Sequence, residues 1–525
     1  MADYEALIVG AGPTGLSMAI ELKRMEIPFR LVEKSEKPPL YSQALVVQAR
    51  TLEQFERYGI AETAVKRGRR LKHASLISEG KQIVSFTLDK IPGHYPFVLF
   101  LPQNETEVLL IEHLESLGGK VERGVELKSI AEKGDEVAVE LRGADGKLQN
   151  ATAAWVMGCD GAHSAVRDGL KIPFSGEAVE LNFFLGDLEL EGPQLPGDEL
   201  CIFLHRGDVV FIGKLKEKLF RVIVALHSEQ DAPERKERLT IADFQKYIDN
   251  AGIQLQVVSS QWMTPFRVSD RRAEHTRHGR VFLAGDASHI HSPVAGQGMN
   301  TGIQDTANLA WKLAAVRNGA DARLLDSYEE ERGMVSEALL KATSRGLKAA
   351  TASNRLVEEI RDIFLRFATR IPLVQEQMVG FVSETAISYR DSTIVADAGG
   401  GGSLHAGDRM PNPEILWKGR EMRLLDPLKS GKHLIVGFDV QDTSRIQELL
   451  QQAEFLFVNS VDLARGKEEL EHLLGARGEM VAIRPDGYIG FRGRADQVEE
   501  LVKYGRMVGL GRPRTAGERA QSAQV

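Results

Sequence analysis

The chain has 525 residues, of which 43% are hydrophobic, and this length allows two to four domains with sizeable cores. The formal net charge of −8 argues against nucleic-acid binding, and the two distant cysteines, Cys159 and Cys201, argue against a disulfide framework or a thiol-ligated metal site. Because the N-terminus lacks a basic flank and no run of about 18 apolar residues occurs, we expect no signal peptide, no membrane association and a cytoplasmic location.

The first predicted element is a buried strand that runs into a glycine-rich turn. Residues 6–9 form a continuous apolar run, and the glycines of GAGPTG (10–15) follow at the spacing of a dinucleotide-binding turn. A helix and a second apolar strand over 29–32 come next, and that strand ends at Glu33. An acid about 20 residues after the first glycine can accept hydrogen bonds from an adenosine ribose. The pattern indicates a dinucleotide site and leaves NAD and FAD open.

Two further predicted strands each end beside a glycine and an acid. The apolar residues 153–157 lead to Asp160 and Gly161, and the run 281–284 leads to Gly285 and Asp286. After Gly298 the spacing becomes helical, and one apolar helix face is formed by Met299, Ile303, Ala307, Ala310 and Leu313. A single NAD site would need neither addition, whereas a longer dinucleotide lying across several strand ends would need both.

His289 and His291 raise the alternative of a metal site. Two histidines at this spacing can point to one side of an extended segment, but a third ligand is needed and no cluster supplies it. We therefore expect no metal and interpret both histidines as hydrogen-bonded residues that fix the turn.

The second half of the chain changes character twice. Residues 176–268 contain short runs of alternating apolar and polar residues, with HRGD (205–208) as a hairpin turn, and this predicts an antiparallel sheet. Residues 325–395 read as helical. A glycine-rich break over 397–413 then precedes strand candidates at 433–438, 455–460 and 479–491 and a helix over 495–508. We expect a disordered tail over 511–525.

In order and separation, the three motifs resemble those of the class A flavoprotein aromatic hydroxylases, the p-hydroxybenzoate hydroxylase-like FAD monooxygenases. The matching segments are GAGPTG with Glu33, CDGAHSAVR (159–167) and AGDASHIHSPVAGQGMNTGIQD (284–305), and the resemblance covers roughly residues 1–340. The C-terminal part resembles the thioredoxin-like domain of phenol and polyketide hydroxylases. It contains no cysteine, which excludes redox activity there and leaves a structural or homodimer contact.

The resemblance implies a set of FAD-binding residues. Asp286 would hold the ribityl chain, the backbone of 296–300 would lie along the flavin ring, and Asp160 with Arg167 would lie at the nucleotide groove. The implied cofactor-binding residues are Gly10, Gly12, Pro13, Thr14, Gly15, Glu33, Lys34, Arg50, Gln103, Asp160, Gly285, Asp286, Pro293, Gly296, Gly298, Met299 and Asn300. The sequence departs from the family pattern at Gln43, where family members often carry arginine.

A catalytic role is implied for one residue and a substrate contact for three. The backbone of Pro293 would face the reacting ring, and a residue that only stiffens the turn is the equal alternative. Phe203, His205 and Phe211 would face the substrate from the antiparallel sheet, although an aromatic residue in a strand is more often part of the core.

The implied fold class is α/β: a Rossmann-like FAD-binding domain with an inserted antiparallel β-sheet substrate domain and a thioredoxin-like C-terminal domain. The FAD-binding domain would comprise 1–175 with 269–395, the substrate domain 176–268 and the C-terminal domain 396–510. The chain has no second dinucleotide turn, so NAD(P)H would bind transiently.

The implied activity is hydroxylation of a small aromatic, phenolic or polycyclic polyketide-like substrate with bound FAD, NAD(P)H and O₂, through a flavin C4a-hydroperoxide. A flavin-dependent reductase, dehydrogenase or oxidase that inserts no oxygen is the alternative, and a non-catalytic flavin-binding protein is the third reading.

Overall fold

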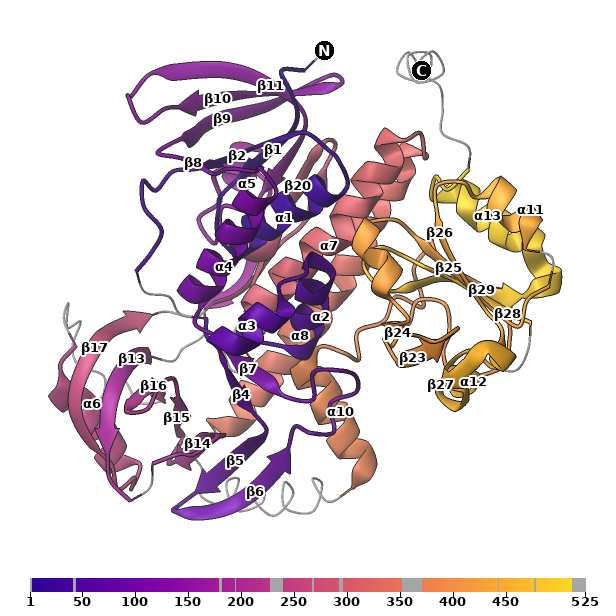
Figure 1. Ribbon diagram of the computed structural model, residues 1–525. Coiled ribbons are helices and arrows are strands. Elements are labelled where there is room, and N and C mark those ends of the chain that lie inside the picture. The colour runs from indigo at the N-terminus through magenta and orange to yellow at the C-terminus, as the bar shows by residue number, and fades with distance from the viewer. Residues whose placement is uncertain are drawn as a thin grey trace.

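A computed structural model describes residues 2–511 except 41–43, 179–181, 194, 227–238, 267–268, 292–295, 352–370, 442 and 476–477. Figure 1 shows three regions: a parallel sheet with its helices, an antiparallel sheet below it, and a C-terminal unit against the helices at one side. Among the described residues, no helix combines the length and the apolar character that a membrane crossing requires.

The first region is built on a parallel sheet. Its strand order is β19-β20-β11-β1-β2-β8, and β1 pairs in parallel with both β11 and β2. The strands are β1 (Tyr4–Val9), β2 (Phe29–Glu33), β8 (Glu122–Arg123), β11 (Leu148–Gly158), β19 (Arg277–His278) and β20 (Val281–Leu283). The antiparallel strands β9 (Glu126–Lys133) and β10 (Glu136–Arg142) extend β11. The predicted strands at 6–9, 29–32, 153–157 and 281–284 thus meet in one sheet.

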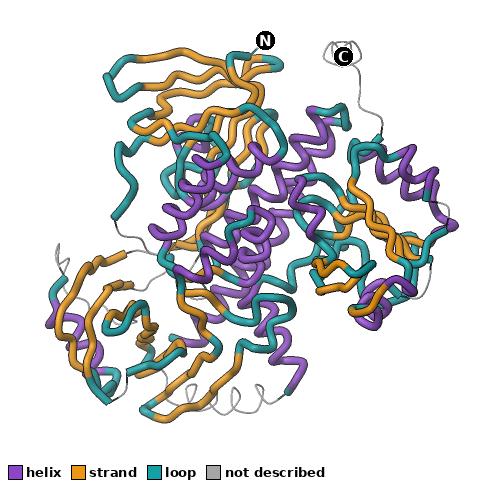
Figure 2. Tube along the Cα trace, in the orientation of Figure 1, coloured by secondary structure: helices purple, strands orange, loops and turns teal. Residues whose placement is uncertain are grey.

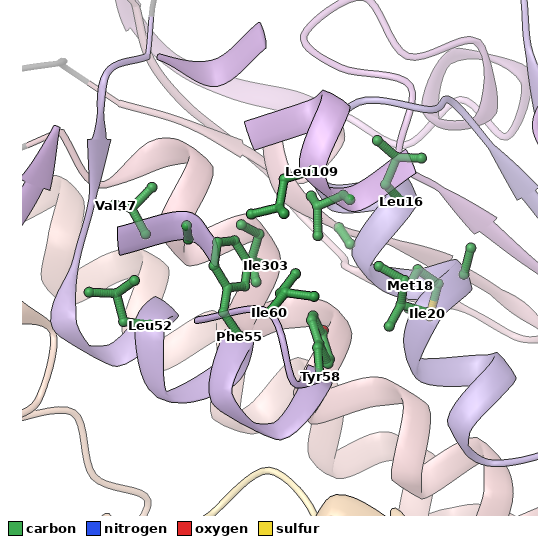
Figure 3. Close-up of a cluster of buried hydrophobic side chains, with 14 of the residues drawn as sticks. Leu16, Met18, Ile20, Val47, Leu52, Phe55, Tyr58, Ile60, Leu109 and Ile303 are labelled. Carbon is green, nitrogen blue, oxygen red and sulfur yellow. The ribbon is translucent and has the colours of Figure 1, made fainter. Parts of the chain in front are cut away.

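Helices pack around this sheet and enclose the main core. They are α1 (Pro13–Arg24), α2 (Ala49–Tyr58), α3 (Ala61–Arg67), α4 (Gln103–Ser116), α5 (Ala165–Gly169), α7 (Gly298–Arg317) and α8 (Asp326–Ala350). Figure 3 shows Leu16, Phe55, Leu109 and Ile303, from α1, α2, α4 and α7, meeting in one apolar cluster. All four side chains are at most 3% exposed. Helix α7 is buried on all sides from Asn300 to Leu313, so it is a core helix rather than an amphipathic surface helix.

The second region is a seven-stranded sheet of order β17-β13-β16-β15-β14-β5-β6. Its strands are β5 (His73–Ser78), β6 (Lys81–Thr87), β13 (Asn182–Glu191), β14 (Glu199–His205), β15 (Asp208–Lys214), β16 (Leu219–Leu226) and β17 (Gln256–Phe266). The predicted hairpin turn is present, with Arg206 and Gly207 at φ values of 49° and 86°. Helix α6 (Ile241–Asn250) packs on one face of the sheet.

Two strands of this sheet come from outside the predicted range 176–268. Strand β5 pairs in parallel with β14, so residues 73–87 complete a sheet whose other strands begin more than 100 residues later. Such a pairing leaves no local signature, because alternation within one strand does not name its partner.

Short sheets connect the two regions. Strands β3 (Val46–Val47) and β4 (Arg69–Leu71) pair with β7 (Val98–Phe100), and strands β12 (Phe174–Ala178) and β21 (His289–Ile290) pair with β18 (Ser269–Ala273). Helix α10 (Pro372–Ser383) leads to the C-terminal unit.

The C-terminal unit has a five-stranded mixed sheet of order β22-β29-β28-β25-β26. The strands are β22 (Ala396–Asp397), β25 (Leu434–Phe438), β26 (Glu454–Val458), β28 (Glu479–Ile483) and β29 (Ile489–Arg494). Helices α11 (Ser444–Leu449), α12 (Lys467–Leu474) and α13 (Val498–Met507) accompany it, with a small sheet of β23 (Glu414–Trp417), β24 (Arg420–Arg423) and β27 (Leu463–Arg465). Figure 2 shows these strands as a compact layer separate from the other two sheets. The predicted strands and final helix of this region are confirmed; the predicted tail, 511–525, lies outside the described residues except for Gly511.

Candidate active site

The turn after β1 requires glycine for two geometric reasons. Gly10 has φ +99°, and a Cβ there would lie 2.4 Å from the carbonyl oxygen of Cys159. A Cβ on Gly15 would lie 1.8 Å from the carbonyl oxygen of Gly10, so helix α1 packs directly on the turn. Gly12 differs, because a Cβ there would meet no atom within 4 Å. Its open side faces the cavity at the start of α1, where helix N–H groups favour an anion.

Glu33 lies against this turn at the end of β2. Its Oε2 accepts a hydrogen bond of 2.9 Å from the Ala11 amide, and its Oε1 accepts one of 2.8 Å from the Ser35 amide. Lys34 beside it is exposed. The carboxylate is thereby fixed next to the glycine turn, as the dinucleotide pattern predicts.

The second motif is held together by its own side chains. Ser164 Oγ donates a 2.6 Å hydrogen bond to Asp160 Oδ1 and accepts one of 3.0 Å from the Arg167 amide at the start of α5. The guanidinium of Arg167 donates to the carbonyls of Ala162 and Ala287. Desolvation raises the pKa of the Asp160 carboxyl, and the hydrogen bond from Ser164 opposes this shift. The arginine therefore joins the second motif to the third.

The third motif presents Asp286 to the cavity. Gly285 has φ +60°, and its amide donates a 2.9 Å hydrogen bond to Asp305 Oδ2. The Asp286 side chain is exposed to the cavity and accepts no hydrogen bond from any described residue. Desolvation by the surrounding protein raises its pKa, whereas the nearby His289 lowers it. An acceptor that protein groups leave open suits the hydroxyl groups of a bound ribityl chain.

The N-terminus of α7 forms the floor of the same cavity. Asn300 accepts a 2.9 Å hydrogen bond from the Gln48 amide and donates to the carbonyls of Val46 and Gly296, at 2.9 and 2.8 Å. Its side chain thus ties the segment before α2 to the first turn of α7. Gly296, Gly298 and Met299 line the cavity, while Asn300 holds them in place.

One cavity of about 450 Å³ joins these motifs to the seven-stranded sheet. From the cofactor side it is lined by Gly12, Pro13, Thr14, Gln48, Gln103, Asp286 and the residues 296–299. From the sheet it is lined by Phe183, Leu185, Leu200, Ile202, Phe211, Gly213, Arg221, Ile223 and Phe266. The cavity therefore combines polar groups suited to a dinucleotide with an apolar wall.

The fit to FAD is supported by three features already described. The open side of Gly12 leaves room for a pyrophosphate, Glu33 is fixed beside the glycine turn, and Asp286 offers an acceptor without a partner among the described residues. A flavin ring bound at the start of α7 would have its developing negative charge stabilised by the N-terminus of this helix. The residues present are thus compatible with bound FAD.

Two predicted contacts to FAD differ in their surroundings. Gln103 lines the cavity and donates a 2.9 Å hydrogen bond to Glu107. Arg50 points elsewhere: it is 2% exposed, donates to Glu53 and to the carbonyl of Asp486, and lies 4.7 Å from the ring centroid of Tyr488. The structure therefore places Arg50 at the contact with the C-terminal unit and not in the cavity wall.

Of the three predicted substrate residues, only Phe211 faces the cavity. Phe211 lines the cavity, but Phe203 packs on the opposite face of the sheet, in the core beneath α6. His205 lies on the same side as Phe203, with Nδ1 3.0 Å from Oε1 of Glu79. The sequence CIFLH is apolar on both faces, so alternation alone did not fix which residues face inward. Ile202, the neighbour of Phe203, lines the cavity instead.

Sequence reasoning missed Arg221 altogether. It lines the cavity at 3% exposure, and Asp187 on the neighbouring strand binds its guanidinium at 2.6 and 2.9 Å. The sequence did carry a signal for this residue, because Arg221 is the charged residue in the apolar run FRVIVAL of β16 and lies on the same face of the strand as Ile223.

Pro293 and Gln43 lie outside the described residues. The rings of His289 and His291 stack 6.2 Å apart, and His289 Nε2 lies 2.9 Å from Asp305 Oδ2. In the described part of the chain, no group of three or more His, Cys, Asp or Glu residues could hold a metal ion.

The chain is similar to known proteins over most of its length. The family described as FAD binding domain matches residues 3–343. A 6-methylpretetramide 4-monooxygenase from Streptomyces rimosus is 32% identical over 517 residues, which cover 95% of this chain and 92% of that protein. A pentachlorophenol 4-monooxygenase from Sphingobium chlorophenolicum is 30% identical over 528 residues and covers 96% of both. The solved anhydrotetracycline hydroxylase from Streptomyces rimosus has a TM-score of 0.81 at 26% identity, covering 97% of this chain and 100% of that chain.

The chain therefore belongs to the FAD binding domain family. It is an FAD-dependent monooxygenase with NAD(P)H and O₂ as co-substrates. Because its relatives over almost the whole chain are monooxygenases, the alternative of a reductase, dehydrogenase or oxidase that inserts no oxygen is not favoured.

Proposed function

We propose that this monooxygenase hydroxylates a planar phenolic substrate bound between the start of α7 and the inner face of the seven-stranded sheet. The observation that supports this most strongly is the shared cavity, which is lined by both Asp286 and Phe211. By their names, two relatives act on 6-methylpretetramide and pentachlorophenol. A phenol is the simplest class of substrate that suits a cavity with an apolar wall and the guanidinium of Arg221.

The wall would position the substrate and keep water out. Phe183, Ile202, Phe211 and Ile223 offer flat or branched apolar surface, which favours a ring over an extended polar molecule. Bound FAD supplies the transfer of electrons from NAD(P)H to O₂ and the activation of oxygen. Exclusion of water by these side chains would direct the activated oxygen to the substrate rather than to the release of H₂O₂.

Arg221 would orient the phenolic oxygen. Asp187 holds the guanidinium in a bidentate pair at the edge of the cavity, so its direction is fixed before any substrate arrives. The pair with Asp187 carries no net charge, so it is hydrogen-bond donation from the guanidinium that would favour the ionised form of a nearby phenol, and a phenolate ring is more electron-rich. The ring carbon beside that oxygen would then be the site of hydroxylation.

The predicted cofactor residues remain proposals for FAD, with one reassignment. The glycine turn with Pro13 and Thr14 would receive the pyrophosphate, Glu33 with Lys34 the adenosine ribose, and Asp160, Gly285 and Asp286 the groove and ribityl chain. Gln103 and residues 296–300 would lie near the ring, as would Pro293. Arg50 would act indirectly, through its contact with the C-terminal unit.

The C-terminal unit would be thioredoxin-like, with a domain boundary near residue 396. This proposal is supported by its strand order: β25 pairs in parallel with β26 and antiparallel with β28, which pairs antiparallel with β29. Neither free cysteine lies in this unit, so its role would be structural or a homodimer contact. Light scattering of the purified chain would test the homodimer.

Matched pairs of ligands test the substrate class. A panel of planar phenols and their O-methyl ethers should be added to the FAD-loaded protein while NADPH or NADH oxidation is followed. We expect phenols to stimulate oxidation at least about tenfold over their ethers, because only a phenol can present an oxygen anion to Arg221. Equal stimulation by ethers would contradict the assigned role of Arg221, and stimulation only by aliphatic compounds would contradict the aromatic class.

A further inference from the structure

The carboxylate of Asp305 fixes the turn that carries Asp286. It is 1% exposed, and its Oδ2 accepts the hydrogen bond from the Gly285 amide and lies 2.9 Å from His289 Nε2. Its Oδ1 accepts a 2.6 Å hydrogen bond from Arg332 Nε. Desolvation would raise the pKa of this carboxyl, but the charge of Arg332 and the bond to His289 lower it to about 2. Asp305 is therefore ionised, and it depends on Arg332 for that charge state.

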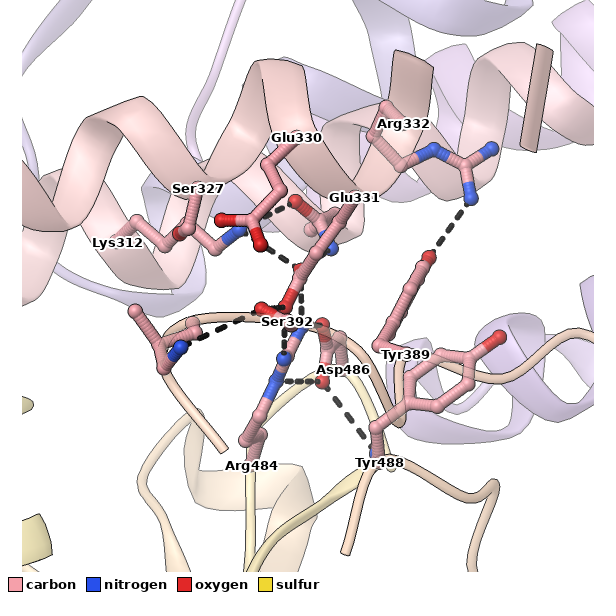
Figure 4. A network of polar contacts seen from close by, with 12 residues as sticks. Lys312, Ser327, Glu330, Glu331, Arg332, Tyr389, Ser392, Arg484, Asp486 and Tyr488 are labelled. Atoms are coloured by element: carbon pink, nitrogen blue, oxygen red, sulfur yellow. Dashed lines mark hydrogen bonds and ion pairs between the residues drawn. The ribbon is translucent and has the colours of Figure 1, made fainter. Parts of the chain in front are cut away.

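Arg332 uses its three nitrogens for three different parts of the molecule. Besides Nε on Asp305, one NH2 group donates at 3.2 Å to the carbonyl of Thr301, in the first turns of α7. The other donates at 2.8 Å to the hydroxyl of Tyr389. Figure 4 shows Arg332 on α8 reaching across to Tyr389 below it. One buried guanidinium thus contacts the support of the Asp286 turn, the helix at the cavity floor and the segment that leads to the C-terminal unit.

Tyr389 is itself held by the C-terminal unit. Its amide donates to the carbonyl of Gly407 at 2.8 Å, and its ring lies 4.3 Å from that of Tyr488. Tyr488 ends the β28–β29 turn, whose Arg484 lies 5.2 Å from the Tyr389 ring and binds Glu331, the neighbour of Arg332 on α8. Docking of this turn therefore sets the position of the Tyr389 hydroxyl that Arg332 requires.

We propose that Arg332 is a positioning residue for the flavin: it couples the Gly285–Asp286 turn and the start of α7 to docking of the C-terminal unit through Tyr389. The contacts run without interruption from Gly285 to Asp305, Arg332, Tyr389 and Tyr488. Coupling between two sites is reciprocal, so FAD binding should also tighten the contact of the β28–β29 turn. The C-terminal unit then has a function that needs no cysteine.

The substitution Tyr389→Phe tests this coupling because it removes one hydroxyl and keeps the ring. Tyr488→Phe is the matched control, since the Tyr488 hydroxyl is buried and has no hydrogen-bond partner among the described residues. For Y389F we expect FAD dissociation constants about fivefold or more above wild type, and unchanged values for Y488F. The affinity for reduced FAD should fall more than that for oxidised FAD, because the start of α7 faces the developing charge; this appears as a lower midpoint potential.

Hydrogen exchange gives a readout that a loss of stability alone would not produce. FAD should slow amide exchange over residues 484–489 in wild type and Y488F, and this protection should be reduced in Y389F. Should Y389F fail to fold, Arg332→Lys, which keeps the charge and loses the planar fork, takes its place. FAD affinity and exchange are measured without substrate, so their result is independent of the phenol class. Equal FAD affinity, potential and protection in Y389F and wild type would overturn the coupling, as would the absence of FAD-dependent protection in wild type.

Discussion

The Ala11 amide and Glu33 Oε2 are joined by a 2.9 Å hydrogen bond, so the acid that ends β2 is fixed against the glycine turn that ends β1. In the proposed site, where Glu33 would receive the adenosine ribose, this contact would preform the adenosine end. Within this turn Gly12 and Gly15 then have separable roles, because Gly12 faces open space where the ligand would lie and Gly15 lets α1 pack on the turn.

Gly12→Ala and Gly15→Ala should separate FAD binding from folding. The Cβ of the first variant would enter open space, so its apoprotein should melt like wild type while FAD affinity falls at least about tenfold. The Cβ of the second would lie 1.8 Å from the Gly10 carbonyl oxygen, so we expect destabilisation by about 1–3 kcal/mol or more even without FAD. Calorimetry of the apoproteins and fluorescence titration with FAD measure the two effects. Normal FAD affinity in G12A would contradict the pyrophosphate position.

Phe203→Ala and Phe211→Ala should separate core packing from substrate binding. Phe203 is 6% exposed beneath α6, and its truncation should lower the free energy of unfolding by about 3–5 kcal/mol. Phe211 faces the cavity, so its truncation should cost little stability and raise the KM for a phenol about fivefold or more. Urea unfolding and steady-state kinetics measure both. The reverse pattern would show that the inward face of β14 and β15 has been misassigned.

Phe203 and Phe211 also show which features of the fold and site can be predicted from the sequence. The glycine turn, Glu33, Asp286 and the C-terminal strands follow from local patterns, because each depends on neighbours in the chain. The side of β14 that faces the cavity does not follow, since both of its faces are apolar. The β5–β14 pairing, Arg50 bound to the Asp486 carbonyl and Arg332 bound to Tyr389 join residues far apart in sequence, and no spacing encodes them.

Glu384 should make stability depend on pH with an unusual sign. Its carboxyl is buried beside Thr301 and Gln304, and desolvation raises its pKa from 4.5 to about 8, against the opposing charge of Arg332. The folded state therefore keeps a proton that the unfolded state has lost between pH 4.5 and 8. Over this range the carboxyl lowers stability as pH rises, by up to about 1.4 kcal/mol per pH unit.

The substitution Glu384→Gln should remove this dependence. Wild type and variant should unfold with similar free energies near pH 4.5, and the variant should become the more stable as pH approaches 8. Denaturant unfolding at intervals across this range measures the difference. Parallel curves for the two proteins would contradict the raised pKa.

Arg484 should be essential for attachment of the C-terminal unit. Its guanidinium binds Glu331 at 2.6 and 2.9 Å, both side chains are 0% exposed, and Lys312 and Asp486 complete a network of balanced charge. Arg484→Met leaves Asp486 buried without its cation, so we expect a loss of about 3–5 kcal/mol. The double variant R484M/D486N, which removes one charge of each sign, should recover part of that loss. Arg445→Gln, at an exposed pair on the same unit, is the control and should change stability by less than about 1 kcal/mol.

Transfer of oxygen from O₂ to a phenol tests the central claim most directly. FAD-loaded protein should be supplied with NADH or NADPH, a phenol that stimulates oxidation, and ¹⁸O₂, and the product mass should be determined. We predict a product that carries one ¹⁸O atom, in an amount close to the NAD(P)H consumed. Stimulated oxidation that yields only H₂O₂ and unlabelled phenol, across every phenol that stimulates it, would contradict the assignment of this cavity to aromatic hydroxylation.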